Sequence, residues 1–556
     1  MGSRDAEAAP GPRPAARRRG GFAVLVAAGI LLSRLAGLVR ERVFAHYLGS
    51  SRAADAFKAA LKVPNFLQNL FGEGVLSASF IPVYAKLLAD GDAELADRVA
   101  GVFVSLLALC VAVLVLLGVV LAPWLLDAIA PGFEGEVRDL TVHIVRILFP
   151  GVGLLVLSAW CLGVLNSHHR FFLSYVAPVL WNLAMIVTLV AFGARLAQVD
   201  LVIALSWGTV VGSALQLLVQ LPWVIRSAPH LVFGLDRSLE PVREIGRNLG
   251  PVVVGRGVVQ LSAYVDQMIA SYLPAGAVAG LAYAQTLYLL PISLFGMSVA
   301  AAELPQMSRQ TGSRDAVHAV IRARLERGLR QVAFFVIPSA VAFVALGRLL
   351  VAALYQTGAF GEDQTRYVWY ILVGSTVGMF AMTQGRLYSS AFYALRDTRT
   401  PLRFATIRVA LTAALGVLLA FPLRWTLVAL VAFLGLPLPA STGGAAAMGT
   451  VGLTASAGVA GWLEFLLLRG ALQRRIGPVA FPVPAQVRLW AAAVAAALLA
   501  LAVDVLGGAA LAQRLPLAHV ARALVAAGAF GTAYLGATMA LGVPEARATL
   551  GRLARR

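Results

Sequence analysis

The stretch GGFAVLVAAGILLSRLAGLVRERVFAHYLG, residues 20–49, is long and apolar enough to cross a membrane as a helix, yet its second half is charged. A membrane helix needs about 20 mostly apolar residues to cross roughly 30 Å of hydrocarbon. A charge at the bilayer centre costs at least about 2.5–3.5 kcal/mol on insertion scales, so it persists where it meets water or a partner. The charged residues here are Arg34, Arg40, Glu41 and Arg42. The stretch therefore predicts a membrane helix that borders a hydrated, charged space.

The whole chain has the composition of a membrane protein. Of its 556 residues, 59% are apolar and 13% are charged, whereas soluble proteins carry about 25% charged residues. Long apolar runs recur from end to end, which favours helices over the short alternating strands of a β-barrel. We therefore predict an all-α polytopic membrane protein with about fourteen transmembrane helices. The candidate spans lie near residues 22–48, 55–85, 100–127, 140–163, 172–194, 201–225, 249–273, 278–305, 331–355, 367–393, 404–422, 446–468, 488–506 and 518–541.

The basic residues indicate how these spans are oriented. Cytoplasmic loops of membrane proteins are enriched in Lys and Arg. With the N-terminus in the cytoplasm, every second loop of this chain is rich in arginine, and the loops between them are poor in it. The even number of spans then predicts that both termini are cytoplasmic. The net charge of +19 follows this alternation, so we expect no nucleic-acid partner.

A weak internal repeat predicts two similar halves. FIPVYAK (80–86) resembles ELPQMSR (303–309), and LGVLNSHHRFF (162–172) resembles FYALRDTRTPL (392–402). Six spans separate the copies, so the copies share one orientation, and a parallel repeat places a substrate cavity between two pseudo-symmetric lobes. The predicted division is a basic tail over 1–20, an N-lobe over 21–228, a C-lobe over 229–472, two further helices over 473–545 and a basic tail over 546–556.

The second span carries a polar stripe along one face. In ADAFKAALKVPNFLQNLFGEG (54–74), polar residues recur at intervals of three or four, which places them on one side of a helix. Pro64 is expected to kink this helix, and Gly72 and Gly74 to loosen its end. A solvated surface helix would explain the stripe but not the apolar remainder, so we predict that the stripe lines a cavity. The stripe consists of Asp55, Lys58, Lys62, Asn65, Asn69 and Glu73.

The charges expected inside the membrane are mostly positive. Arg256 and Asp266 lie deep in the seventh span, ten residues apart, so they are not expected to pair directly. Arginine offers a planar fork for phosphate oxygens, and lysine offers a point charge. A cavity lined by such groups suits an anion, above all a phosphate or pyrophosphate. The embedded cations are Arg34, Arg40, Lys58, Lys62 and Arg256.

No set of residues points to catalysis or to a tightly bound cofactor. The two cysteines, Cys110 and Cys161, both lie in apolar runs. The histidines are scattered, and the chain has no phosphate-binding loop, HExxH or GxSxG motif. We therefore predict a transporter and not an enzyme.

Several segments resemble the MurJ (MviN) family of lipid II flippases, which belongs to the exporter superfamily of MATE transporters and polysaccharide flippases. The resemblance rests on SRLAGLVRE (33–41), ADAFKAALKVPNFLQNLFGEGVLSASFIPVY (54–84), VDQMIAS (265–271), LAYAQTLYLLPISLFGMSVA (281–300) and AFYALRDTRTP (391–401). It implies fourteen spans, two lobes and an alternating-access cycle in the bacterial inner membrane. It also implies transport of undecaprenyl-pyrophosphoryl-MurNAc-pentapeptide-GlcNAc, the peptidoglycan precursor, to the outer leaflet, in contact with peptidoglycan synthases.

The resemblance assigns roles to residues that match the family motifs. The family's function implies that the arginines hold the pyrophosphate. Where the family usually has arginines, this chain has Gln68 and Thr286. We hypothesise that Lys58, Lys62 or Arg256 supplies the missing charge. The matching cavity positions are Ser33, Arg34, Arg40, Asp55 and Asn65.

The energy source is left open by the sequence. Asp266 matches an acid that binds sodium in some family members, but RVALTAALG (408–416), in the eleventh span, contains no second acid. Coupling to Na⁺ or to the membrane potential therefore remains an expectation. The alternative functions are a MATE-like multidrug exporter and another polyprenyl-pyrophosphate oligosaccharide flippase. A site for cationic drugs would favour exposed acids over arginines.

Overall fold

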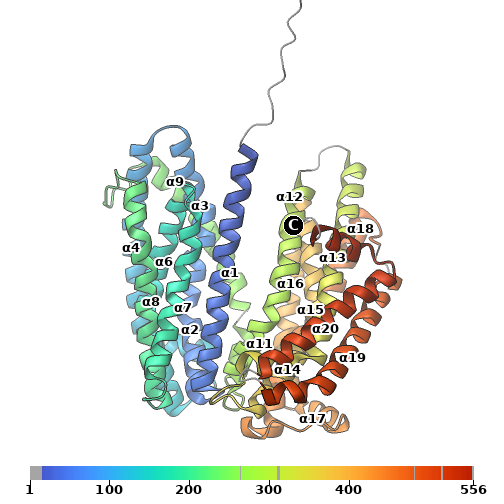
Figure 1. The fold of residues 1–556 in the computed structure, drawn as a ribbon. Coiled ribbons are helices and arrows are strands. Elements are labelled where there is room, and N and C mark those ends of the chain that lie inside the picture. The colour runs from blue at the N-terminus through green and yellow to red at the C-terminus, as the bar shows by residue number, and fades with distance from the viewer. Residues whose placement is uncertain (1–14, 263, 310–312, 481–482, 515–517, 554–556) are drawn as a thin grey trace, which may run out of the picture. The chain divides into compact units, whose positions relative to one another are not determined.

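The computed structural model describes residues 15–553 except 263, 310–312, 481–482 and 515–517. The described residues are almost entirely helical and form no β-strand, only an isolated bridge between Thr357 and Phe360. The prediction of an all-α polytopic membrane protein is therefore confirmed. Figure 1 shows the helices and their labels.

The helices divide between two compact units that interleave along the sequence. Unit 1 comprises the described residues up to Val43, with Ala60–Leu125 and Val142–Gln260, and unit 2 comprises Phe44–Ala59, Leu126–Thr141 and the described residues from Leu261 onward. The turn from the first to the second helix thus belongs to unit 2, although the helices around it belong mostly to unit 1. The lobe boundaries expected from the sequence stay a prediction.

Unit 1 is a bundle of long helices. They are α1 (Ala15–Leu48), α2 (Arg52–Phe71), α3 (Glu73–Ala89), α4 (Ala93–Val120), α6 (Gly135–Ser167), α7 (Phe171–Phe192), α8 (Gln198–Ser227) and α9 (Glu240–Ser262), of which α1, α2, α6 and α9 extend into unit 2. The short α5 (Ala122–Ile129) joins α4 to α6. Helix α2 runs through Pro64 and ends at Phe71, so the interruption of the second span lies at Gly72.

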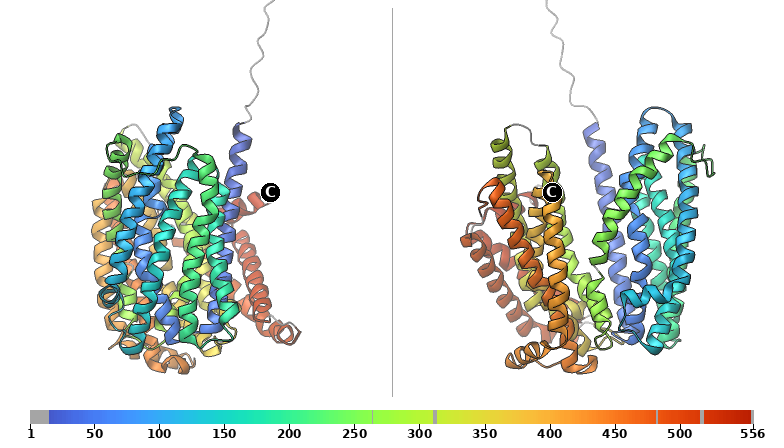
Figure 2. Two further views of the ribbon diagram at one scale, coloured as in Figure 1. Left: turned by 90° about the vertical axis from the view of Figure 1, so that its left-hand side faces the viewer. Right: turned by 180° about the vertical axis from the view of Figure 1, so that it is seen from behind.

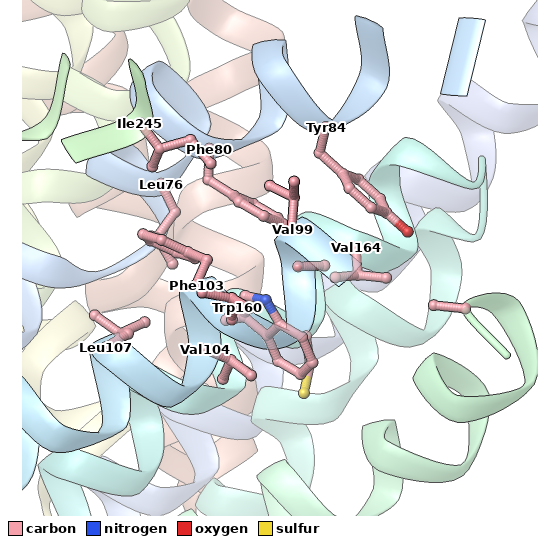
Figure 3. Close-up of a cluster of buried hydrophobic side chains, with 14 of the residues drawn as sticks. Leu76, Phe80, Tyr84, Val99, Phe103, Val104, Leu107, Trp160, Val164 and Ile245 are labelled. Carbon is pink, nitrogen blue, oxygen red and sulfur yellow. The ribbon is translucent and has the colours of Figure 1, made fainter. Parts of the chain in front are cut away.

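The core of unit 1 contains a cluster of buried hydrophobic side chains in which aromatic rings stack (Figure 3). The rings of Phe80 and Phe103 stack with their centroids 5.0 Å apart, and Tyr84 stacks on the other side of Phe80 at 5.3 Å. Trp160 of α6 belongs to the same buried cluster. Between helices in a membrane, close packing of this kind supplies much of the attraction, since lipid is as apolar as the side chains.

Unit 2 contains the remaining helices. They are α10 (Val265–Ala270), α11 (Ala277–Pro291), the π-helical turn η1 (Ile292–Met297), α12 (Ser298–Ser308), α13 (Arg314–Ala345), α14 (Gly347–Tyr355), α15 (Glu362–Ala394), α16 (Arg399–Ala420), α17 (Arg424–Phe433), the 3₁₀ turns η2 (Ala440–Thr442) and η3 (Gly444–Ala447), α18 (Met448–Ile476), α19 (Val483–Arg514), α20 (Ala518–Ala540) and α21 (Pro544–Leu553). Helices α19 and α20 lie side by side (Figure 2).

Helices α15 and α18 approach so closely that glycine is required on both. A Cβ atom on Gly378 would lie 2.3 Å from the Cα atom of Gly458, closer than two carbon atoms can pack. Small residues at such crossings allow membrane helices to pack backbone against backbone. This crossing stabilises the centre of unit 2.

Every candidate span predicted from the sequence falls on one or more of these helices. Ten helices of the described chain are long and apolar enough to cross a membrane. The other predicted spans lie on α1, α2–α3, α9–α10 and α15. The total of fourteen stays a prediction. The predicted site residues lie on α1, α2, α9 and α10, which are not among the ten helices.

Candidate functional site

Arg40 of α1 is held in place by neighbouring side chains of unit 1. Its Nη1 donates to Oδ1 of Asn182 at 3.0 Å, and its Nη2 lies 2.6 Å from Oε1 of Glu41. The guanidinium carbon lies 4.9 Å from the ring centroid of Trp181, which adds a cation–π contact. The Asn182 amide in turn donates to the carbonyl oxygen of Pro178, one turn back in α7.

This arrangement orients a guanidinium without burying it. The Arg40 side chain stays 17% exposed, while Glu41 is buried. The adjacent carboxylate offsets part of the cost of placing the charge in a largely apolar unit. Gly37 lies one turn before Glu41 and leaves space beside Asn182. A Cβ atom added to Gly37 would lie 3.9 Å from Oδ1 of Asn182. Arg40 is therefore positioned to present part of its fork to a ligand.

The other predicted residues of unit 1 are at least partly accessible. Arg34 is exposed and Ser33 is half-buried, both on α1, and Lys62 and Asn65 are half-buried on α2. Arg256 belongs to α9, but its side chain lies outside the described residues. Unit 1 thus contains five of the predicted binding residues with described side chains.

Asp55 belongs to unit 2 and caps a helix. Its two carboxylate oxygens accept hydrogen bonds from the backbone amides of Gly276 (2.6 Å) and Ala279 (2.7 Å) at the start of α11. Gly276 has a φ of +90°, a left-handed conformation that glycine adopts without a steric penalty. A negative charge is favourable at a helix N-terminus, where amides have no partner within the helix. The carboxylate, which is only 4% exposed, is thus engaged with the protein backbone.

Lys58, one turn after Asp55, lies among aromatic rings. Its Nζ lies 4.3 Å from the ring centroid of Phe44 and 5.5 Å from that of Tyr283. The Tyr283 hydroxyl donates to the carbonyl oxygen of Gly49 at 2.7 Å, which fixes the ring in place. The electron-rich faces of aromatic rings attract a desolvated cation. The buried ammonium therefore contributes to packing within unit 2.

Asp266 lies in the first turn of the short α10 and is half-buried. Helix α10 packs against α16, where Thr412 is buried. Across the described residues, no three or more His, Cys, Asp or Glu side chains are grouped so that they could hold a metal ion. Glu464 lies on α18, which packs against α16, and its carboxylate is bound to Arg408 at 2.8 Å. A sodium site at Asp266 stays a prediction.

Sequence reasoning missed two of the partners of Arg40. Trp181 and Asn182 stand together in the apolar run VAPVLWNLAMIV (176–187), where an asparagine is costly unless it is bound. That cost was the available signal. This chain has Thr286 and Gln68 at two positions where the family usually has arginine. The Thr286 hydroxyl donates to the carbonyl oxygen of Ala282 in its own helix, and Gln68 lines a polar cavity of unit 1.

Comparisons with known proteins agree on one family. The profile of a family described as "Lipid II flippase MurJ" matches residues 44–436. The "Lipid II flippase MurJ" of Burkholderia cenocepacia is 32% identical over 483 residues, which cover 86% of this chain and 88% of that protein. The "Probable lipid II flippase MurJ" of Rhizobium tropici is 33% identical over 462 residues, which cover 81% of this chain and 80% of that protein.

Solved structures share the fold. "Lipid II flippase MurJ, inward closed conformation" matches with a TM-score of 0.71 and 21% identity, over 93% of this chain and 99% of that chain. An inward-facing multidrug resistance MATE family transporter of the MOP superfamily matches with a TM-score of 0.57 and 17% identity, over 82% of this chain and 100% of that one. At these identities, the matches establish a common helical architecture and do not distinguish between substrates.

Proposed function

The chain belongs to the lipid II flippase MurJ family, and we propose that it moves lipid II from the cytoplasmic to the outer leaflet by alternating access. Lipid II is the undecaprenyl-pyrophosphate-linked peptidoglycan precursor. No bond is made or broken in this process, so the protein acts as a transporter. Its partners are then lipid II, the bilayer and the peptidoglycan synthases that use the product.

The observation that carries this proposal is the fixed guanidinium of Arg40. Arginine binds phosphate oxygens with two parallel N–H donors, and a fork that is already oriented loses less entropy on binding. Asn182 and Glu41 provide that orientation. A pyrophosphate is an anion that such a fork can bind from the partly exposed side of the side chain.

Arg34 is the second cation in this proposal. It lies six residues before Arg40 on α1, about 9 Å along the helix axis, and it is exposed. The two residues also lie about 120° apart around the helix axis, so we propose that their long side chains bend toward each other to reach the two phosphates of one headgroup. Lys62, half-buried on α2, adds positive charge within the same unit. We propose that Ser33, Asn65 and Arg256 complete the binding region.

The location and the energy source belong to the same proposal. We place the protein in the bacterial cytoplasmic membrane with both termini in the cytoplasm, because that orientation puts most loop arginines on the cytoplasmic side. We expect no bound cofactor. Movement of charged side chains through the field couples transport to the membrane potential, at about 2.3 kcal/mol per charge per 100 mV. Sodium at Asp266 is the alternative coupling.

The test is complementation of a bacterium depleted of its own flippase, with precursor in the outer leaflet as the readout. The wild-type chain should restore growth and outer-leaflet lipid II, and Arg40→Ala should not. The matched control is Arg195→Ala, since Arg195 is an exposed arginine between α7 and α8. Failure of the well-expressed wild-type chain to expose lipid II would refute the proposal.

A second arm separates the alternative functions. Purified protein in liposomes is offered lipid II, or a cationic dye of the kind that multidrug exporters move. Transport of the dye, with no movement of lipid II, would favour a multidrug exporter. Movement of other polyprenyl-pyrophosphate oligosaccharides at the same rate as lipid II would show that the protein recognises the pyrophosphate and not the attached sugars.

A further inference from the structure

Unit 1 contains a polar cavity of about 280 Å³ that the binding residues discussed above do not line. It lies between the end of α2 and the sides of α6, α7 and α8, so it is contained within one compact unit. Amides and hydroxyls dominate its polar lining, and none of the described side chains that line it is charged. These polar residues are Gln68, Asn69, Ser158, Ser174, Gln216 and Gln220.

Two polar atoms on its wall lack partners within the described part of the chain. Gln220 is 1% exposed, and its amide nitrogen donates to the Ser158 hydroxyl at 2.6 Å and to the Gln216 carbonyl oxygen at 2.8 Å. Its side-chain oxygen, Oε1, accepts no hydrogen bond. Ser174, 2% exposed, likewise has an unpartnered hydroxyl. A buried polar group without a partner costs about 1–3 kcal/mol, so such groups mark places where a ligand or water completes the bonding.

The cavity also lies beside a break in the backbone. Helix α2 ends at Phe71 and α3 begins at Glu73, with Gly72 extended between them. A Cβ atom on Gly72 would lie 2.3 Å from the carbonyl oxygen of Gln68, so this break requires a glycine. Irregular backbone at membrane depth is tolerated where it lines a cavity, and transporters place binding sites at such interrupted helices. The break and the unpartnered atoms are independent observations that point to one ligand site.

The chemistry of the wall selects the class of ligand. A glutamine amide both donates and accepts hydrogen bonds, and a serine hydroxyl does the same. With no charge among the described lining residues, an ion would remain uncompensated, whereas hydroxyl and acetamido groups would find partners. Leu155, Ala159 and Leu162 supply an apolar side for a ring face or a methyl group. One water needs only about 10–15 Å³ of such space, so the cavity accommodates a larger group.

We propose that this cavity binds a neutral N-acetylated sugar of the lipid-linked substrate. The inference rests on the proposed function and deepens it, because the cationic residues would hold the pyrophosphate while the cavity of unit 1 reads the attached saccharide. With the orientation expected from the sequence, the lining residues of α6, α7 and α8 lie in the cytoplasmic half of their spans. The sugar would thus be recognised on the side from which the substrate is taken.

The test compares two lipids on the full-length protein in nanodiscs. One is lipid II, and the other is undecaprenyl pyrophosphate, which has the same anionic group and tail but no sugar. Gln220→Leu removes the amide at similar volume and should weaken lipid II binding about five- to tenfold, as expected for the loss of one or two neutral hydrogen bonds. Binding of undecaprenyl pyrophosphate should not change. Ser174→Ala, a smaller alteration, should also weaken lipid II binding and leave the binding of undecaprenyl pyrophosphate unchanged.

Two control variants make the outcome specific. Gln384 of α15 in unit 2 is also a fully buried glutamine with an unpartnered oxygen, so Gln384→Leu should leave the ratio of the two affinities unchanged. Arg40→Ala should weaken both lipids together. Thermal unfolding of each variant shows whether the fold is retained, and Ser174→Ala decides the matter if Gln220→Leu does not fold.

The results separate failure of this inference from failure of the proposed function. If the wild-type protein binds neither lipid, the proposed function fails. If it binds both lipids, and the Gln220 and Ser174 variants leave their ratio unchanged, the cavity holds only water and this inference alone is overturned. Free N-acetylglucosamine serves as an independent probe, and it should compete with lipid II and not with undecaprenyl pyrophosphate.

Discussion

The carboxylate of Asp55 accepts a hydrogen bond from the backbone amide of Gly276, 221 positions later in the chain, at 2.6 Å. This bond joins the start of α2 to the start of α11, within unit 2. The sequence places Asp55 among the substrate-binding residues. Its geometry shows a carboxylate that stabilises a helix N-terminus, and a direct role toward substrate stays a prediction.

Removal of this cap should destabilise the protein. Asp55→Ala leaves the amides of Gly276 and Ala279 without an acceptor, which should lower the free energy of unfolding by about 1.5–3 kcal/mol, the range for hydrogen bonds to a charged group. Asp55→Asn keeps one acceptor oxygen and should cost less. Denaturant unfolding of the detergent-solubilised protein measures both, and Asp139→Ala, at an exposed acid, is the control. Equal stability of Asp55→Ala and the wild type would contradict the capping role.

Lys58 should contribute more to stability than to substrate affinity. Lys58→Met keeps most of the side-chain volume but removes the charge that lies over Phe44 and Tyr283. A cation–π contact of a desolvated cation contributes about 2 kcal/mol or more, so the free energy of unfolding should fall by about 2 kcal/mol.

The measurement for Lys58 is thermal unfolding together with lipid II binding. Affinity should fall less in Lys58→Met than in Arg40→Ala, because the ammonium is buried among rings. Tyr283→Phe keeps the ring and loses the hydroxyl that donates to Gly49, so it should retain the contact with Lys58. Stronger loss of affinity in Lys58→Met than in Arg40→Ala would assign Lys58 to the substrate instead.

Arg40 should not be replaceable by lysine. Arg40→Lys keeps a positive charge but cannot bond to Asn182 and Glu41 while it also presents a planar fork to phosphate. Outer-leaflet lipid II should fall about tenfold or more, whereas Arg195→Lys in the exposed loop should have no effect.

Asn182→Ala should act in the same direction through Arg40. It leaves the charge present and removes the acceptor that orients it, so affinity should fall by a smaller factor than in Arg40→Lys. The double variant Arg40→Lys, Asn182→Ala should be no worse than Arg40→Lys alone, because the two residues act through one interaction. Additive losses in binding measurements would show that Asn182 acts independently.

Asp397, in the loop between α15 and α16, should make stability depend on acid pH. The hydroxyl and amide of Thr400 donate to its carboxylate, and together with Arg475 they lower its pKa below the usual value of 3.8. A folded-state pKa that is depressed contributes stability above the unfolded-state pKa and loses it as pH falls toward the folded-state value. The contribution should thus be constant from neutral pH to about pH 5 and decline below it.

The measurement for Asp397 is the difference in unfolding free energy between the wild type and Asp397→Asn. This difference should shrink as the pH is lowered from about 5 to about 3. A difference that grows with acidity would mean that the carboxylate is not stabilised in its charged form.

The helices could largely be predicted from the sequence, because length and apolar content alone decide whether a segment can span lipid. The break at the end of the second span was also foreseeable from Gly72, which lacks the side chain that would collide with Gln68. The boundary within the seventh span was not: α9 ends at Ser262, and Asp266 lies in the first turn of the separate short helix α10, which begins at Val265. Local patterns do not show where one helical segment ends and the next begins.

The site was only partly predictable for the same reason. The expectation that Arg34 and Arg40 carry function rests on the cost of charge in lipid, a property of each residue taken alone. What each charge contacts depends on residues far away, as with Arg40 and Asn182, which are 142 positions apart. The cavity of unit 1 depends on polar residues from four helices that show no motif in any of them.

The sequence by itself determined that this chain crosses the membrane repeatedly as helices and carries cations within it, because hydrophobicity and charge act residue by residue. Only the tertiary structure decided that Asp55 binds a helix end, that Arg40 is oriented by α7, and that two buried polar atoms of unit 1 share an open cavity. Those outcomes depend on distances between side chains from different helices, and packing sets these distances.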